Sequence, residues 1–237
     1  MDLLAATVLL RPYVFAFLAA FLAAGTADLG WRRTLLFGVC LWPLAWLAEF
    51  SSTRIGIPFG LYHYTGATRG RELYIAGVPF MDSLSFTFLA YGAFCLARAA
   101  LGPIRASRGT LALLAGFLMM LLDVVIDPVA LRGDRWFLGG IFYYPEGGAY
   151  FGVPLSNFGG WWLVGTAGVG AYLWSAGDAR GRRTWPGVAL YYAVLAFNLA
   201  VTAWIGEWLL LGAGLVLHAA AALAGSSIRL RERRAVQ

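Results

Sequence analysis

Seven segments of the chain each have the length and apolar composition of a helix that crosses a lipid bilayer. They are residues 12–27, 34–50, 80–101, 110–128, 159–176, 187–204 and 207–224. A spanning helix needs about 20 mostly apolar residues. Of the 237 residues 60% are hydrophobic and 13% charged, whereas a soluble domain carries about 25% charged residues. The sequence therefore predicts one all-α domain over 1–237, a polytopic membrane helix bundle of about seven transmembrane helices. Six are possible, because Arg11-Pro12 interrupts the first segment and its start could be an interfacial turn.

The arginines predict how these segments are oriented. Twelve of the 18 basic residues fall on one set of connections, which includes the C-terminal tail, and six fall on the opposite set. Because positive charge is retained on the cytoplasmic side, we expect a multi-pass protein of the cell membrane with its N-terminus outside and its C-terminus in the cytoplasm. The two longest connections, 51–79 and 129–158, are then both on the outer side. No basic region precedes the first apolar run, so a cleaved signal peptide is not expected.

The residue inventory excludes several classes of enzyme. All the basic residues are Arg, which removes a Schiff-base lysine and a P-loop lysine. The two histidines, His63 and His218, are too few for a membrane di-iron hydroxylase. Cys40 and Cys95 lie far apart in apolar runs and are read as packing thiols. The net charge of +6 is scattered over short loops, so no nucleic-acid partner is expected, and neither a cofactor nor a metal is predicted.

The depth of the acidic residues is the most informative feature. Under the predicted topology, five acids and one asparagine lie at the outer ends of the spans: Glu49, Asp82, Asp123, Asp127, Asn157 and Glu207. An ionisable group inside a span costs about 2.5–3.5 kcal/mol and by default marks a functional site. Asp123 and Asp127 are spaced i,i+4, about 5–6 Å apart on one helix face. Two carboxyl groups that close do not both ionise readily, so the pair is expected to hold a proton. Pairing of these acids with Arg54, Arg132 or Arg135 is the structural alternative.

A weak internal repeat relates two parts of the chain. Gly77-Val-Pro-Phe-Met-Asp82 matches Gly152-Val-Pro-Leu-Ser-Asn157, within segments of about 46–101 and 120–176. Proline suits the first turn of a helix, because its missing N–H would be unpaired there. Each motif therefore predicts a helix start, and the two copies would form a parallel repeat. Coincidence of a common helix-start pattern is the alternative.

Aromatic residues crowd both long connections, where they could line a pocket for an apolar substrate. Candidates are Phe59, Tyr62, Tyr64, Trp136, Tyr150 and Phe151. The alternative is an interfacial belt, where Trp and Tyr are enriched in any membrane protein. The glycine-rich run from Gly165 to Gly170 lies inside a span and is expected to allow close helix packing.

Four short sequence motifs together resemble those of one protein family. They are Gly56-Ile-Pro-Phe-Gly-Leu-Tyr-His-Tyr64, Gly77-Val-Pro79, the Asp123/Asp127-Pro128 pair and Tyr150-Phe-Gly-Val-Pro-Leu-Ser-Asn157-Phe. They resemble the bacterial and archaeal carotenoid biosynthesis membrane proteins, which include bisanhydrobacterioruberin hydratases and γ-carotene 1',2'-hydratases. The resemblance covers about 46–162. It implies a cofactor-free hydratase that adds water to the terminal double bond of an acyclic carotenoid such as lycopene. The expected partners are then the carotenoid substrate, membrane lipid and other membrane enzymes of the carotenoid pathway.

Such a reaction needs a desolvated carboxylic acid, cation-stabilising groups and a held water. We expect Asp127, the nearer of the pair to the membrane surface, or Asp123 to donate the proton. Asp82, Glu49 and Asn157 would position water or tune the pair, and the aromatic candidates would line the end-group pocket.

Three other functions fit parts of the sequence. A carotenoid end-group cyclase would use the same acids but capture the cation with an internal alkene. A membrane prenyltransferase would need a second acidic motif for Mg²⁺-diphosphate, which is missing. A non-catalytic carotenoid-binding protein is the third alternative. The acid cluster disfavours it, because a hydrocarbon ligand offers buried carboxylates no group to bind.

Overall fold

The computed structural model describes residues 2–102, 106–177 and 180–235, with side chains as far as residue 225. Its helices are α1 (Leu3–Leu10), α2 (Pro12–Leu29), α3 (Trp31–Ile55), α4 (Phe80–Leu101), α5 (Arg108–Ala130), α6 (Leu155–Ser175), α7 (Trp185–Trp204) and α8 (Trp208–Ala235), with a 3-10 turn at Gly133–Arg135. Four two-residue strands, β1 (His63–Tyr64), β2 (Tyr74–Ile75), β3 (Val78–Pro79) and β4 (Phe142–Tyr143), lie in the connections. The predicted all-α bundle is confirmed.

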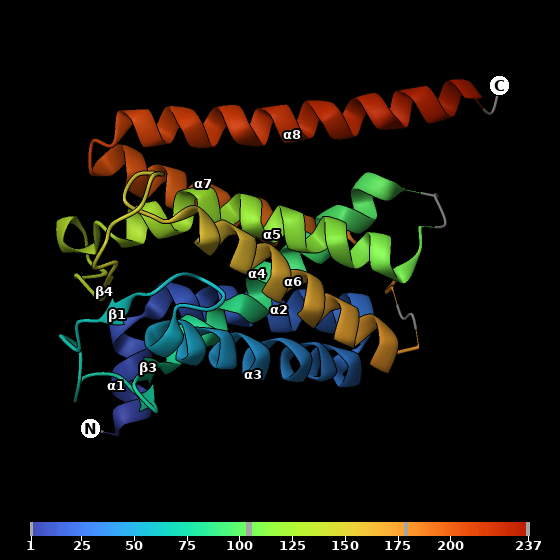
Figure 1. Ribbon diagram of the computed structural model, residues 1–237. Helices are drawn as coiled ribbons and strands as arrows, with labels where there is room; N and C mark the ends of the chain where they lie inside the picture. The colour runs from blue at the N-terminus through green and yellow to red at the C-terminus, as the bar shows by residue number, and fades with distance from the viewer. Residues whose placement is uncertain (1, 103–105, 178–179, 236–237) are drawn as a thin grey trace.

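The long helices α2 to α8 run side by side and alternate in direction, and α8 lies along the outside of the bundle (Figure 1). The two long connections, 56–79 and 131–154, meet at one end of the bundle, which we call the loop end. Six helices are long and apolar enough to cross a membrane, namely α2, α3, α4, α5, α7 and α8 as far as Gly225. The remaining predicted span, residues 159–176, corresponds to α6. This helix is equally long, but it is too rich in Gly and Trp to be counted among the six apolar candidate spans.

Local sequence explains where the helices begin and end. Pro12 opens α2 and separates it from the short α1, so the first predicted span begins where expected. Helices α4 and α6 begin one residue after Pro79 and Pro154, the prolines of the two matching motifs. Gly56 ends α3 with a left-handed φ of 76°, a conformation that glycine adopts without steric cost.

The centre of the bundle is packed through small residues. A Cβ on Gly116 of α5 would lie 2.3 Å from Thr166 Oγ1 of α6, and one on Gly165 would lie 3.0 Å from the Gly116 Cα. Only glycine permits this approach, so the close packing predicted for the glycine-rich part of α6 is confirmed. Helices α4 and α5 each supply more buried apolar side chains than any other helix.

Short strands tie the two loops together at the loop end. β1 pairs with β4 in antiparallel register, His63 opposite Tyr143, so the first loop is joined to the second. β2 and β3 form a hairpin whose turn residues, Ala76 and Gly77, both have positive φ, as a type I′ turn requires. The two long connections therefore form an ordered cap over the loop end of the bundle.

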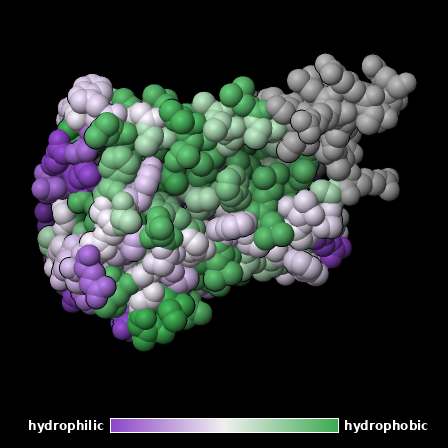
Figure 2. Space-filling model, turned by 45° about the horizontal axis from the view of Figure 1, so that its top comes forward, coloured by the Kyte–Doolittle hydropathy of each residue, from purple (hydrophilic) through white to green (hydrophobic). Residues whose placement is uncertain are grey.

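The surface has the pattern of a membrane protein. Figure 2 shows hydrophobic residues over the middle of the molecule and hydrophilic residues gathered at the loop end, with a smaller group at the other end. Helix α8 contributes large exposed apolar side chains, including Leu209 at 82% and Leu223 at 69% exposure. Such a band is stable only against lipid or another apolar surface, which identifies a multi-pass membrane protein.

Candidate functional site

A cavity at the loop end carries three carboxyl groups on its wall. Glu49 comes from α3, Asp82 from the first turn of α4 and Asp127 from the last turns of α5. Each lies near the loop end of its helix, so segments far apart in sequence bring their acids to one place. No Arg, Lys or His is among the described residues that line the cavity.

Asn157, at the start of α6, joins the Asp123 and Asp127 carboxyl groups. Its amide nitrogen donates to Asp123 Oδ2 and Asp127 Oδ2, at 2.7 Å each. Asp127 is half-buried and faces the cavity, whereas Asp123 is fully buried and lies off its wall. Because Asn157 donates to both Oδ2 atoms, Oδ1 is the favoured position for a proton on either acid.

Two tyrosines of the first loop cover the carboxyl groups. The hydroxyl groups of Tyr62 and Tyr64 are 3.3 Å apart, and that of Tyr64 also reaches the carboxyl groups of Glu49 and Asp82. Burial raises the pKa of Tyr64 well above its ordinary value, and the charges of Asp82 and Glu49 raise it further. Tyr64 therefore stays a neutral hydroxyl that can donate a hydrogen bond.

Aromatic rings form the wall beside the acids. Phe86 of α4 and Trp161 of α6 stack at 4.2 Å between ring centroids, and the Phe59 ring lies 5.9 Å from Phe86. The Trp161 side chain also hydrogen-bonds to Asp127. Stacked rings next to an acid can stabilise a nearby cation. Sequence reasoning did not place Phe86 in the site, although Phe86 lies four residues after the predicted site residue Asp82 on the same helix face.

The structure brings most of the other predicted residues to the cavity. Phe59, Tyr62, Tyr64, Trp136 and Asn157 all line it. Tyr150 and Phe151 do not.

The ring of Tyr150 packs on Phe158 at 5.3 Å, and the Phe151 carbonyl accepts a hydrogen bond from Arg132 at 3.1 Å. Both residues lie outside this cavity, and the second loop turns back here at a left-handed Phe151.

Glu207 is separate from the acid cluster, contrary to the sequence expectation. It forms an ion pair with Arg132 at 3.0 Å and another with Arg135. Partial burial alone would raise the pKa of Glu207, but the Arg132 and Arg135 guanidinium groups outweigh it and lower the pKa below its ordinary value of 4.5. The structural alternative therefore holds for Glu207. Among the described residues, no group of three His, Cys, Asp or Glu side chains could hold a metal ion.

Known proteins resemble the chain over most of its length. The family described as "Carotenoid biosynthesis protein" matches residues 7–221 of the chain. A relative from Haloarcula japonica named bisanhydrobacterioruberin hydratase is 34% identical over 206 residues, which cover 82% of this chain and 67% of the relative. No solved structure matches the chain.

Proposed function

The chain belongs to the carotenoid biosynthesis protein family, and we propose that it is a carotenoid 1,2-hydratase. In this proposal it adds water across the terminal 1,2 double bond of an acyclic carotenoid end group. The observation that carries the proposal is Asp127, a carboxyl group in the wall of an aromatic cavity, linked through Asn157 to a second, fully buried carboxyl group. The hydratase named among its relatives supports the same class of reaction.

The proposed reaction begins with proton transfer to the alkene. Asp127, protonated on Oδ1, gives its proton to C2, the less substituted carbon, and a tertiary cation forms at C1. Three carboxyl groups share the cavity without a basic side chain, so at least one of them is expected to hold a proton. The negative charge left on Asp127 and the faces of Phe86 and Trp161 stabilise the cation.

Water then captures the cation. A water molecule held by Glu49, Asp82 and the Tyr64 hydroxyl attacks C1 and loses a proton to a carboxylate. The net change is the addition of one water to the double bond, giving a tertiary alcohol. Excess water would favour the ionised carboxylate, which has no proton to donate, and this explains why the cavity wall is mostly apolar.

The sidedness of the membrane is a further part of this proposal. The distribution of Arg places the loop end and N-terminus outside and the C-terminus in the cytoplasm. Substrate and product both dissolve in lipid, so other enzymes of the carotenoid pathway in the same membrane would exchange them with this protein.

Asp127→Asn tests the proposal. The protein and this variant are expressed in bacteria that make lycopene or a longer acyclic carotenoid, and the pigments are resolved by chromatography and mass. We expect a product heavier by one water, reduced at least 100-fold in Asp127→Asn, because general acid catalysis contributes about 10²–10⁴-fold. Asp134→Asn, the same change at an exposed site, should keep full activity. A new product of unchanged mass would indicate cyclisation instead, and unchanged pigment in both strains would contradict catalysis.

A further inference from the structure

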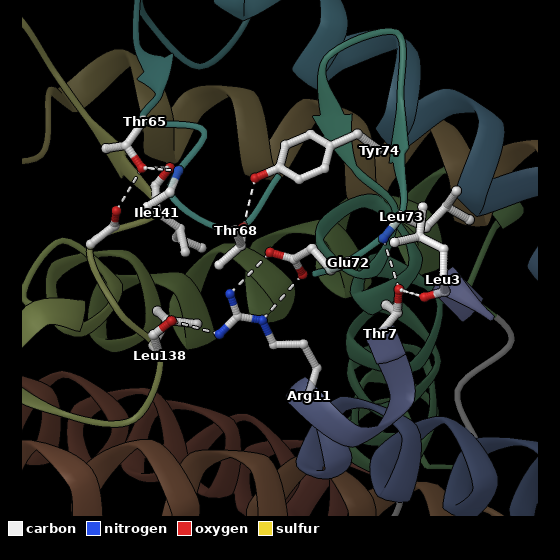
Figure 3. A network of polar contacts seen from close by, with 12 residues as sticks. Leu3, Thr7, Arg11, Thr65, Thr68, Glu72, Leu73, Tyr74, Leu138 and Ile141 are labelled. Atoms are coloured by element: carbon white, nitrogen blue, oxygen red, sulfur yellow. Dashed lines mark hydrogen bonds and ion pairs between the residues drawn. The ribbon is translucent and has the colours of Figure 1, made fainter. Parts of the chain in front are cut away.

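The loop end of the cavity is closed. Leu138, Ile141 and Tyr144 of the second loop are buried and line the cavity from this end. Figure 3 shows how the cap is fixed, with the Arg11 guanidinium between the Glu72 carboxylate and the Leu138 carbonyl. Arg11 Nε and Nη2 donate to Glu72 at 3.3 and 3.1 Å, and Nη1 donates to Leu138 O at 2.6 Å. A large hydrophobic substrate cannot enter here without breaking a fully buried ion pair.

The same cavity extends away from the acids into the bundle. We call this extension the apolar arm, formed by Phe17 of α2, Phe88 and Leu89 of α4, and Val194 and Phe197 of α7. Asp82 and Leu89 both line the cavity and are seven residues apart on α4. At 1.5 Å per residue the arm reaches about 10 Å deeper than the carboxyl groups.

The arm comes near the surface at the seam between α2 and α7, where the Phe17 and Phe197 rings meet. Phe17 and Phe197 line it and are half-buried, whereas Leu89 and Val194 are buried. Nearer the loop end the seam is covered by aromatic rings, with Tyr13 stacked on Phe197 at 5.2 Å and Phe137 5.5 Å from Tyr13. Both α2 and α7 are candidate membrane spans, so this seam faces lipid.

The chemistry of the arm suits a hydrocarbon chain. The Phe17 ring lies 5.7 Å from both Phe88 and Phe197, which gives a wall of flat rings. Asn198, the polar residue beside the arm, already donates its amide to Val194 O at 2.9 Å. A wall of this kind offers dispersion contacts to a stiff conjugated chain and no partner to a polar group.

We propose that the apolar arm is the subsite for the polyene segment next to the reacting end group, and that the substrate enters sideways from the bilayer between α2 and α7. This rests on the proposed function. Because the arm is only about 10 Å long, the rest of the chain stays in the lipid while the end group meets Asp127. The subsite therefore selects substrates whose end group continues into a linear hydrocarbon chain.

The experiment compares two variants of α7, one with a bulky side chain that fills the apolar arm and one with the same side chain on the outer face of the helix. Val194→Trp places a bulky ring in the arm, whereas Ala193→Trp places one on the exposed face of α7. Each purified protein is measured for bound carotenoid by absorbance, and for hydration of the carotenoid and of 6-methylhept-5-en-2-one, a short alkene with the same terminus. Thermal unfolding in detergent checks that both variants fold.

We expect Val194→Trp to lose at least tenfold in carotenoid binding and hydration but to convert the short alkene within about twofold of Ala193→Trp. Equal carotenoid binding by the two variants would overturn the subsite, as would equal loss of both substrates in folded Val194→Trp. If the unmodified protein binds carotenoid but hydrates nothing, the proposed reaction fails, whereas the binding comparison still decides the subsite.

Discussion

At the scale of single residues, Asn157 organises the acids. It gives one amide hydrogen to each of Asp123 and Asp127 and thereby fixes which carboxyl oxygen of Asp127 is left for a proton. Leucine has a similar volume but no donor. Its introduction would leave two buried carboxyl oxygens without partners.

Asn157→Leu should therefore lower the hydration rate at least tenfold. A hydrogen bond to a charged group contributes about 1.5–3 kcal/mol, and about 1.4 kcal/mol corresponds to a factor of ten in rate. The rate is measured from product formed per amount of purified protein. Ser156→Ala, an exposed neighbour on α6, serves as the control. An Asn157→Leu enzyme with the rate of this control would show that the bridge has no part in the reaction.

The acids were predictable because each ends or begins an apolar segment, and helix alternation alone then brings Glu49, Asp82 and Asp127 to one end. The sequence could not show that Asp123 lies behind Asp127, because both occupy one helix face and only the packing of α6 decides which one meets the cavity. That Tyr150 and Phe151 lie outside the cavity could not be read from the sequence for a related reason. The path of a loop depends on distant contacts, such as the Arg132 bond to the Phe151 carbonyl.

At the scale of elements, helix α6 shows the limit of reading spans by hydropathy. It packs closely against α5 through Gly116 and Gly165, so it needs small residues where other spans have large apolar ones. A span was predicted over 159–176, and the helix begins four residues earlier, at Leu155, while its composition falls outside that of the six candidate spans. The parallel repeat of 46–101 and 120–176 stays a prediction.

Glu207 links two elements, and its contribution to stability should depend on pH. It pairs with Arg132 and Arg135, which joins the end of α5 to the turn between α7 and α8. Its folded-state pKa is lowered below 4.5, so the contribution is present above the unfolded pKa and is lost as pH falls through the folded pKa. Glu207→Gln should lower the unfolding temperature slightly at pH 7 and by less at pH 3, because the contribution falls once the pH is below 4.5. A loss of the same size at both values would mean that packing, not charge, explains it.

At the scale of the whole molecule, one ion pair closes the loop end. The Arg11 and Glu72 side chains are both 0% exposed, and with Leu138 they join the start of α2 to both long loops. The sequence showed Arg11 only as a charge at the start of a span, because the partner lies 61 residues away. Closure of the cavity and sideways entry therefore both depend on a contact that local patterns do not reveal.

Removing one partner of this pair should destabilise the protein strongly, whereas removing both should not. Arg11→Met or Glu72→Leu alone leaves an uncompensated buried charge, which costs about 3–5 kcal/mol. The double variant replaces the pair with apolar groups and should recover much of that loss. Unfolding of all four proteins in detergent, followed by tryptophan fluorescence, gives the coupling energy of the pair. Losses in the single variants that simply add in the double variant would show that the two groups act independently, and that the loop end is held closed by its apolar packing instead.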